Sequence, residues 1–151
     1  MSSPMSRLTK PLLFASSAEC EQAFYEALEG GDIDALTDLL HDDEDVCCVH
    51  PGGPRLIGFA AVRASWAAIL ANGALRIRAH ARKTVETPAV ALHNVIEELV
   101  VEQGRQPKIV RVIATNGYVK TPAGWKMVLH HASPAPEGPV EEFEARTGPL
   151  H

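Results

Sequence analysis

The spacing of apolar residues changes near residue 74, and this change constrains the fold more than any other feature of the sequence. Before it, apolar side chains recur every three or four residues, as on one face of a helix; after it, they alternate with polar ones, as in a half-buried strand. We therefore expect helices up to residue 70 and strands from residue 75 onwards. Helices grouped ahead of strands joined by short turns are typical of an α+β fold with an antiparallel meander.

Three helices are predicted in the first half of the chain. Ser16 stands three residues before Glu19, the spacing of a capping box, and the glycine pair 30–31 ends the helix that starts there. Asp32 is placed to cap a short second helix. A third helix is expected over 58–70, where Trp66 and its apolar neighbours share one face.

Four long strands are predicted after residue 74 and a short one before it. The basic residues Arg76, Arg78, His80 and Arg82 alternate with apolar ones, which places all four on one face of a strand. Such a face is either solvated or paired in salt bridges; the alternative is a surface for an anion or an acidic partner. The expected strands are 46–49, 75–82, 89–102, 109–119 and 125–133.

Size and charge exclude several classes of protein. The 151 residues suffice for one domain with its own core. No apolar run approaches the roughly 18 residues that a membrane helix needs, so no membrane partner is expected. The net charge of −5 argues against general nucleic-acid binding. The three cysteines, Cys20, Cys47 and Cys48, have no spacing typical of a disulfide framework and are expected to be buried thiols.

The ends of the chain differ from its middle. Residues 1–15 are expected to be a leader, 16–134 the folded domain, and 135–151 a proline-rich acidic tail. The apolar stretch 11–15 is too short for the core of a signal peptide, which favours a cytoplasmic location.

Four local motifs, in this order, resemble the NTF2-like superfamily and its SnoaL-like branch, which share a fold with ketosteroid isomerase. Each motif alone is weak, and their order and spacing carry the resemblance over about residues 18–134. They are Ala23-Phe24-Tyr25-Glu26-Ala27 with Gly31-Asp32, Val49-His50-Pro51-Gly52-Gly53 with Ser65-Trp66, His93-Asn94-Val95-Ile96-Glu97, and Thr115-Asn116 with Gly124-Trp125 and His130-His131-Ala132-Ser133-Pro134.

The resemblance implies a cone in which a curved sheet wraps around the N-terminal helices and a pocket opens at one end. It also implies a homodimer formed through the outer face of the sheet, where apolar side chains are left over. The superfamily includes isomerases, cyclases, dehydratases and kinase association domains, so the fold alone does not fix the chemistry.

The candidate catalytic residues are His131, His93 and Glu97. A histidine is a plausible general base near neutral pH, and Glu97 in an apolar site could itself act with a raised pKa. The expected substrate is an apolar or carbonyl-bearing small molecule. The candidate ligand-binding residues are Trp66, Asn116, Tyr118, His50 and Trp125.

The shared face of these residues depends on the pairing of the last two strands. If Lys120 pairs with Trp125, Asn116 faces Leu129 and His131 faces Ala114, which brings the candidates together on the side with the larger apolar residues. A slip by one residue would separate Asn116 and His131. We expect the first register.

Two other interpretations stay open. The same polar residues could form a buried hydrogen-bond network that only holds the sheet or a dimer together. The protein would then be a non-catalytic association module rather than an enzyme.

No aspartate follows residue 74, so the residues of a ketosteroid isomerase do not map onto this chain. A metal site from His50, His93 and His131 has no diagnostic spacing, and neither a metal nor an organic cofactor is expected.

Overall fold

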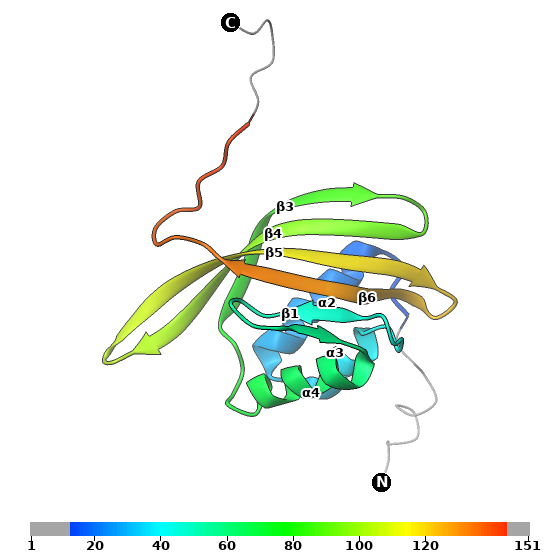
Figure 1. Ribbon diagram of the computed structural model, residues 1–151, viewed down its shortest axis with the longest axis horizontal. Coiled ribbons are helices and arrows are strands. Elements are labelled where there is room, and N and C mark those ends of the chain that lie inside the picture. Colours follow the sequence, from blue (N-terminus) through cyan, green and yellow to red (C-terminus); the bar gives the residue numbers. More distant parts are fainter. Residues whose placement is uncertain (1–12, 145–151) are drawn as a thin grey trace, which may run out of the picture.

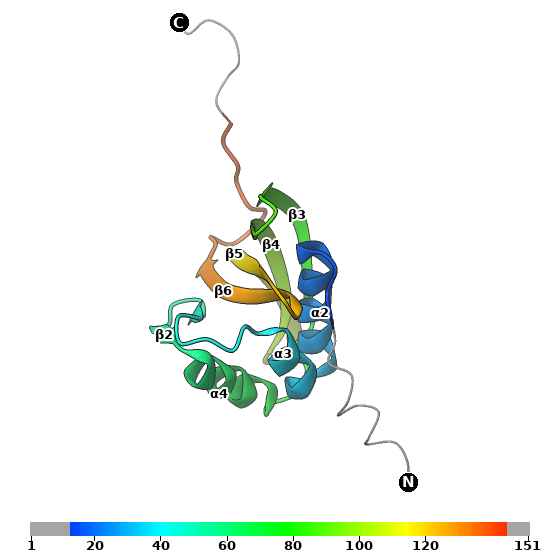
Figure 2. The ribbon, with the colours of Figure 1, turned by 90° about the vertical axis from the view of Figure 1, so that its right-hand side faces the viewer.

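Three helices lie against one face of a six-stranded sheet in the computed structural model, which describes residues 13–144 (Figures 1 and 2). The predicted α+β cone is confirmed. The helices are α2 (Ser17–Gly30), α3 (Ile33–Leu39) and α4 (Phe59–Leu70). The strands are β1 (Cys47–Val49), β2 (Arg55–Ile57), β3 (Ile77–Glu86), β4 (Val90–Gln103), β5 (Gln106–Thr121) and β6 (Gly124–Pro134).

The sheet has the strand order β2-β1-β6-β5-β4-β3. Strands β3 to β6 form the antiparallel meander that was predicted. The short β1 pairs in parallel with β6, so the sheet is mixed rather than purely antiparallel. Strand β2 was not predicted; it is only three residues long and pairs with β1. The hairpin between β4 and β5 extends past the rest of the sheet (Figure 1).

The helix termini confirm the predicted caps. Ser16 accepts a hydrogen bond from the Glu19 backbone N–H, and Asp32 accepts one from Ala35. Gly31 ends α2 with φ of 64°, a left-handed conformation that glycine adopts without strain. These local signals position α2 across the concave face of the sheet (Figure 2).

A bulge in β3 breaks the predicted basic face. Ala81 and Arg82 together lie opposite one residue of β4, and Ala81 has φ of 56°. The extra residue reverses the alternation, so Arg82 points to the helix side, where its guanidinium lies 3.5 Å from Glu21. The prediction that Arg82 shares a face with Arg78 and His80 was therefore wrong.

A second bulge interrupts the pairing of β5 and β6. Lys120 pairs with Trp125 as expected, but Gly117 pairs with Leu129 and Tyr118 with Met127, so Val128 has no partner. Beyond the bulge the alternation of β6 is reversed. This shift decides which of the adjacent histidines, His130 or His131, lies under the helices.

The folded core extends before α2. Phe14, placed in the leader by the sequence, is 7% exposed, and its carbonyl accepts a hydrogen bond from the Trp125 backbone N–H. Residues 1–12 of the leader lie outside the described residues. From Ala135 to Glu144 the tail contains no helix or strand, and Lys108 pairs there with Glu137.

The outer face of the sheet carries no helix within residues 13–144 (Figure 2). Glu98 pairs there with Arg78, His80 and Arg111. Several large apolar side chains on this face are exposed, namely Val85, Val90, Leu92 and Ile109. Over the same range of residues, no helix combines the length and apolar character needed to cross a bilayer.

Candidate functional site

A pocket of about 240 Å³ lies between the helices and the concave face of the sheet. The projecting β4–β5 hairpin contributes part of its wall, and most of the lining is aliphatic. Three titratable side chains, His50, Glu97 and His130, are part of that lining, together with the indole of Trp66. The other lining residues are Leu28, Pro51, Ile69, Leu75, Ile77, Leu99, Val101, Val110, Val112 and Pro134.

Glu97 places a carboxyl group in this apolar wall. The residue is 4% exposed, and the Tyr25 hydroxyl of α2 donates a hydrogen bond of 2.6 Å to its Oε2. Burial raises the pKa of Glu97 to about 7, although the hydrogen bond from Tyr25 opposes the rise; the nearby Glu21 adds to it. Glu97 can therefore gain or lose a proton near neutral pH.

His130, rather than His131, is the histidine of β6 that reaches the pocket. It is 4% exposed, and its Nδ1 lies 2.6 Å from Asn116 Oδ1. His131 pairs with Thr115, is exposed and points to the outer face. The expected facing of His131 and Ala114 was wrong because Val128 is inserted between the paired segments. Burial lowers the pKa of His130 to about 3, and the neighbouring histidines act in the same direction.

His50 and Trp66 form the wall beside His130. Their rings meet edge to face with centroids 4.7 Å apart. His50 Nε2 lies 3.0 Å from the hydroxyl of Ser65, and burial lowers the pKa of His50. Trp66 is 3% exposed, and its Nε1 has no hydrogen-bond partner among the described residues. A buried N–H without a partner is uncommon and points to a ligand or a water at this position.

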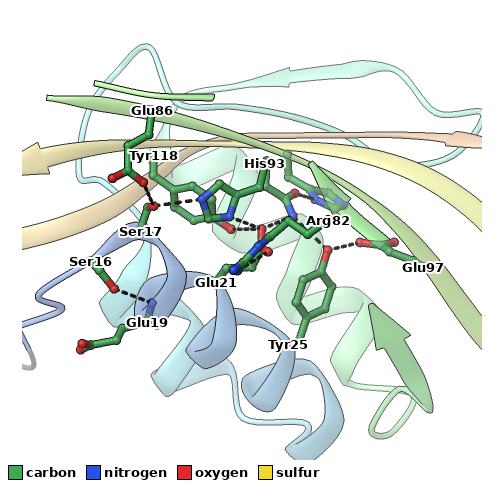
Figure 3. Close-up of polar contacts among 12 residues, drawn as sticks. Ser16, Ser17, Glu19, Glu21, Tyr25, Arg82, Glu86, His93, Glu97 and Tyr118 are labelled. Carbon is green, nitrogen blue, oxygen red and sulfur yellow. Dashed lines mark hydrogen bonds and ion pairs between the residues drawn. The ribbon is translucent and has the colours of Figure 1, made fainter. Parts of the chain in front are cut away.

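A buried network behind the pocket centres on Glu21 of α2 (Figure 3). Its Oε2 accepts hydrogen bonds from Tyr118 at 2.9 Å and from Asn116 at 3.1 Å. The amide of Asn116 also donates to the Tyr25 hydroxyl at 2.9 Å. Through these contacts one helix side chain is coupled to both Glu97 and His130.

The network continues towards β3 through His93 (Figure 3). His93 Nε2 lies 2.9 Å from the hydroxyl of Ser17, which donates to Glu86 at 3.2 Å. His93 Nδ1 also lies 3.0 Å from Glu21 Oε2, a contact whose geometry does not meet that of a hydrogen bond. His93 therefore belongs to the network and does not line the pocket.

The predicted site residues separate into groups. Those that line the pocket are His50, Trp66 and Glu97. Those that belong to the buried network are His93, Asn116 and Tyr118. Trp125 is buried in the core, and His131 lies outside. Within residues 13–144, no three histidine, cysteine or carboxylate side chains are grouped so that they could hold a metal ion.

Sequence reasoning missed three residues of the site, Glu21, Tyr25 and His130. A signal for the first two was present, because Ser17, Glu21 and Tyr25 recur every four residues beside the apolar stripe of the helix. A polar row at that spacing next to a buried stripe indicates side chains that need buried partners. His130 had no comparable signal, since its orientation depends on the bulge.

Comparison with known proteins agrees with this architecture. The model of the SnoaL-like domain family matches residues 18–137. A crystal structure of a protein from Thiobacillus denitrificans, named as a calcium/calmodulin-dependent protein kinase type II association domain, is 33% identical with a TM-score of 0.75. The match covers 83% of this chain and 99% of that one. Comparison with curated proteins gives no match.

Two further crystal structures are similar. A protein from Streptomyces avermitilis, named as a dehydratase of the NTF2-like family, is 30% identical with a TM-score of 0.71; the match covers 88% of this chain and 99% of that one. A CaMKII hub from S. rosetta is 24% identical with a TM-score of 0.66, covering 79% and 94%, which supports the fold alone. The chain belongs to the SnoaL-like family of the NTF2-like superfamily.

Proposed function

We propose that the pocket binds a small, largely apolar compound with a carbonyl group and that Glu97 transfers a proton beside that carbonyl. The observation that carries the proposal is the Glu97 carboxyl, which lines an apolar cavity and has its pKa raised to about 7. A general base is most effective when its pKa is near the working pH.

The volume limits the size of the compound. An engineered apolar cavity of about 150 Å³ binds benzene, so the 240 Å³ here suits a substituted ring or a molecule of similar size. Larger compounds would have to extend beyond the mouth. The buried Nε1–H of Trp66 would gain a partner if the carbonyl oxygen of the ligand lay beside it.

The proposed step needs no cofactor. The ionised carboxylate of Glu97 takes a proton from the carbon next to the carbonyl, and the electron pair of the broken C–H bond moves into the carbonyl to give an enolate. Return of the proton from Glu97 to the same carbon or to a conjugated one regenerates the carboxylate and completes an exchange or an isomerisation. Tyr25 holds Oε2 throughout, which leaves Oε1 to carry the proton.

The test is exchange of α-protons for deuterium. A panel of small cyclic and aryl ketones is incubated with the protein in D₂O at neutral pH, and loss of the α-proton signals is followed by NMR. We expect exchange catalysed by the wild type and reduced at least a hundredfold in Glu97→Gln. Glu98→Gln is the matched control, because Glu98 follows Glu97 in β4 but lies on the outer face. Equal exchange by both variants would exclude Glu97 as the base.

A second candidate function is self-association through the outer face of the sheet. Val85 is 69% exposed and Leu92 is 43% exposed on a face that no helix covers within residues 13–144. Apolar surface of this kind marks interaction sites, and the similar protein from Thiobacillus denitrificans is named as an association domain. We propose a homodimer through this face, which is compatible with a working pocket.

Sedimentation velocity over a range of concentrations tests the dimer. Leu92→Lys should shift the wild-type dimer towards monomer, because a charged side chain would be buried between the two sheets. Leu13→Lys is the control, since Leu13 is 62% exposed and precedes the first helix. Identical sedimentation of the two variants would contradict an interface on this face.

A further inference from the structure

We infer that Glu21, acting through Asn116, fixes His130 as a hydrogen-bond acceptor towards the pocket, so that the pocket selects compounds with a hydroxyl group. This inference deepens the proposed function and rests on its first half, the binding of a small compound. It does not depend on proton transfer by Glu97.

The argument begins with the orientation of Asn116. Its Nδ2 lies 3.1 Å from Glu21 Oε2, an oxygen that already accepts a hydrogen bond from Tyr118. Carboxylate oxygens only accept, so the group of Asn116 that faces Glu21 must be the amide NH₂. The contact with Tyr25 agrees, because the hydroxyl proton of Tyr25 goes to Glu97 and its oxygen is left to accept from Asn116.

The orientation of Asn116 then decides the tautomer of His130. With the NH₂ directed at Glu21, the carbonyl oxygen Oδ1 faces His130 Nδ1 at 2.6 Å. Because Oδ1 can only accept, Nδ1 must carry the ring proton. A neutral imidazole has one N–H, so Nε2 is left with a lone pair. Burial lowers the pKa of His130 to about 3, which keeps the ring neutral at physiological pH.

His130 lines the pocket, and its Nε2 has no hydrogen-bond partner among the described residues. His50, the other histidine of the pocket, is held in the opposite tautomer. The hydroxyl proton of Ser65 goes to the carbonyl of Val62 at 2.8 Å, so His50 Nε2 must donate to Ser65. The sulfur of Cys48 lies 3.6 Å from His50 Nε2 and 4.0 Å from Nδ1, so its S–H is a donor within reach of the Nδ1 lone pair. The Nε2 lone pair of His130 has no such donor among the described residues and is thus the neutral acceptor left for a ligand.

The recognised chemistry follows from this arrangement. A compound whose hydroxyl group donates to His130 Nε2 gains a hydrogen bond, whereas its methyl ether offers no donor and leaves the buried nitrogen without a partner. The aliphatic side chains around the histidine accept the apolar remainder. A small apolar alcohol, phenol or enol is the class of ligand that the pocket would prefer.

Three matched probes test the preference. The compounds are 4-propylphenol, 4-propylanisole and propylbenzene, which share the propylbenzene frame and bracket the phenol in size, and of which only the phenol carries a donor. Isothermal titration should show the phenol binding about tenfold more tightly than either of the others. The same ratio is expected in Glu97→Leu, which removes the other acceptor that could hold a phenol. A ratio that disappears in this variant would assign the hydroxyl to Glu97 and overturn the inference.

The tautomer itself is measured by long-range ¹H–¹⁵N NMR of histidine-labelled protein, with the His130 signals assigned by comparison with His130→Gln. The expected state has a proton on Nδ1 and a bare Nε2. Glu21→Gln presents both a donor and an acceptor to Asn116, so Asn116 is no longer held in one orientation. Both tautomers of His130 should then be populated, and the tenfold preference for the phenol should decrease. Glu19→Gln, an exposed residue of the same helix, should change neither.

The outcomes separate the inference from the proposed function. A proton on Nε2 in the wild type overturns the inference whether or not the Glu21 variant folds. Equal binding of all three probes overturns the inference and leaves the pocket intact. Binding of none of them contradicts the inference and the binding half of the proposed function together. A preference for the phenol without any deuterium exchange supports the inference while the catalytic half of the proposed function fails.

Discussion

Tyr25 of α2 donates a hydrogen bond of 2.6 Å to Glu97 of β4, joining residues that are 72 positions apart in the chain. The bond crosses from the helix to the concave face of the sheet, next to the pocket. It stabilises the charged carboxylate in surroundings that otherwise disfavour charge. Tyr25 therefore controls how readily Glu97 gives up its proton.

Replacing Tyr25 by phenylalanine should raise the pKa of Glu97 further, by roughly one unit. The phenylalanine keeps the apolar ring and removes the hydroxyl that donates to the ionised form, a contribution of about 1.5–3 kcal/mol for a bond to a charged group, partly offset by water that can enter. A titration followed by the ¹³C carboxyl signal of Glu97 measures the shift. An unchanged or lower pKa would show that the hydroxyl does not act on the charged form.

Glu97→Gln should change how stability depends on pH. The folded pKa of about 7 lies above the ordinary value of 4.5. The wild type therefore holds stability below pH 4.5 that it loses as the pH rises through 7, and this loss is about 3 kcal/mol at 1.36 kcal/mol per unit. The uncharged glutamine has no such loss, so the free energy of unfolding of the variant should rise relative to that of the wild type as the pH increases from 4.5 to 7.

The pH dependence of stability has to be compared between the variant and the wild type, because the titration of His130 changes stability in the opposite direction. Its folded pKa of about 3 lies below the ordinary 6.5, so its contribution to stability increases as the pH rises between these values. This change is common to both proteins and cancels in the difference. Urea unfolding at several pH values from 4 to 8 gives the two curves, and parallel curves would contradict the raised pKa of Glu97.

Alanine substitutions at the two adjacent histidines should have very different effects. His130→Ala removes a buried ring and leaves Asn116 Oδ1 without its partner, which should cost roughly 2–4 kcal/mol. His131 is exposed on the outer face, so His131→Ala should stay within about 0.5 kcal/mol. Chemical denaturation at low protein concentration measures both. Similar losses at the two positions would mean that the β6 bulge is misplaced.

Gly124→Ala should destabilise the fold by about 2 kcal/mol or more. Gly124 has φ of 90°, and a Cβ there would lie 2.8 Å from the backbone nitrogen of Phe14. The substitution would push away the segment whose carbonyl accepts from Trp125. Gly104→Ala is the control: its φ is 67° and nothing lies within 4 Å of the added Cβ, so it bears only the backbone strain. Equal losses of unfolding free energy would show that the approach of Phe14 is unimportant.

Local signals predicted the helices and the meander well. The side chains of Ser16 and Asp32 cap backbone N–H groups three residues further along the chain, and the pairing of Lys120 with Trp125 follows from the length of one turn. Each of these features is encoded within a few neighbouring positions. The cytoplasmic location and the domain boundaries stay predictions.

The errors in side-chain orientation occurred where one extra residue reverses an alternation. The residue types at Ala81 and Val128 do not indicate a bulge, because neither position is the glycine that commonly occupies one. Both bulges depend on how the curved strands fit over α2, which is a property of the whole fold. They brought Arg82 and His130 inside and kept His131 outside, so the polar part of the site was predicted only in part.

The unpaired Val128 also affects how relatives of this chain should be compared. In a homologue that lacks this residue, β5 and β6 would pair without a bulge, and the residue equivalent to His130 would still lie under the helices. An alignment without a gap at Val128 would then equate a residue of the pocket with a residue of the surface. Gain or loss of this one codon would therefore change the distance in sequence from the turn to the pocket histidine without changing which of the two histidines faces the pocket.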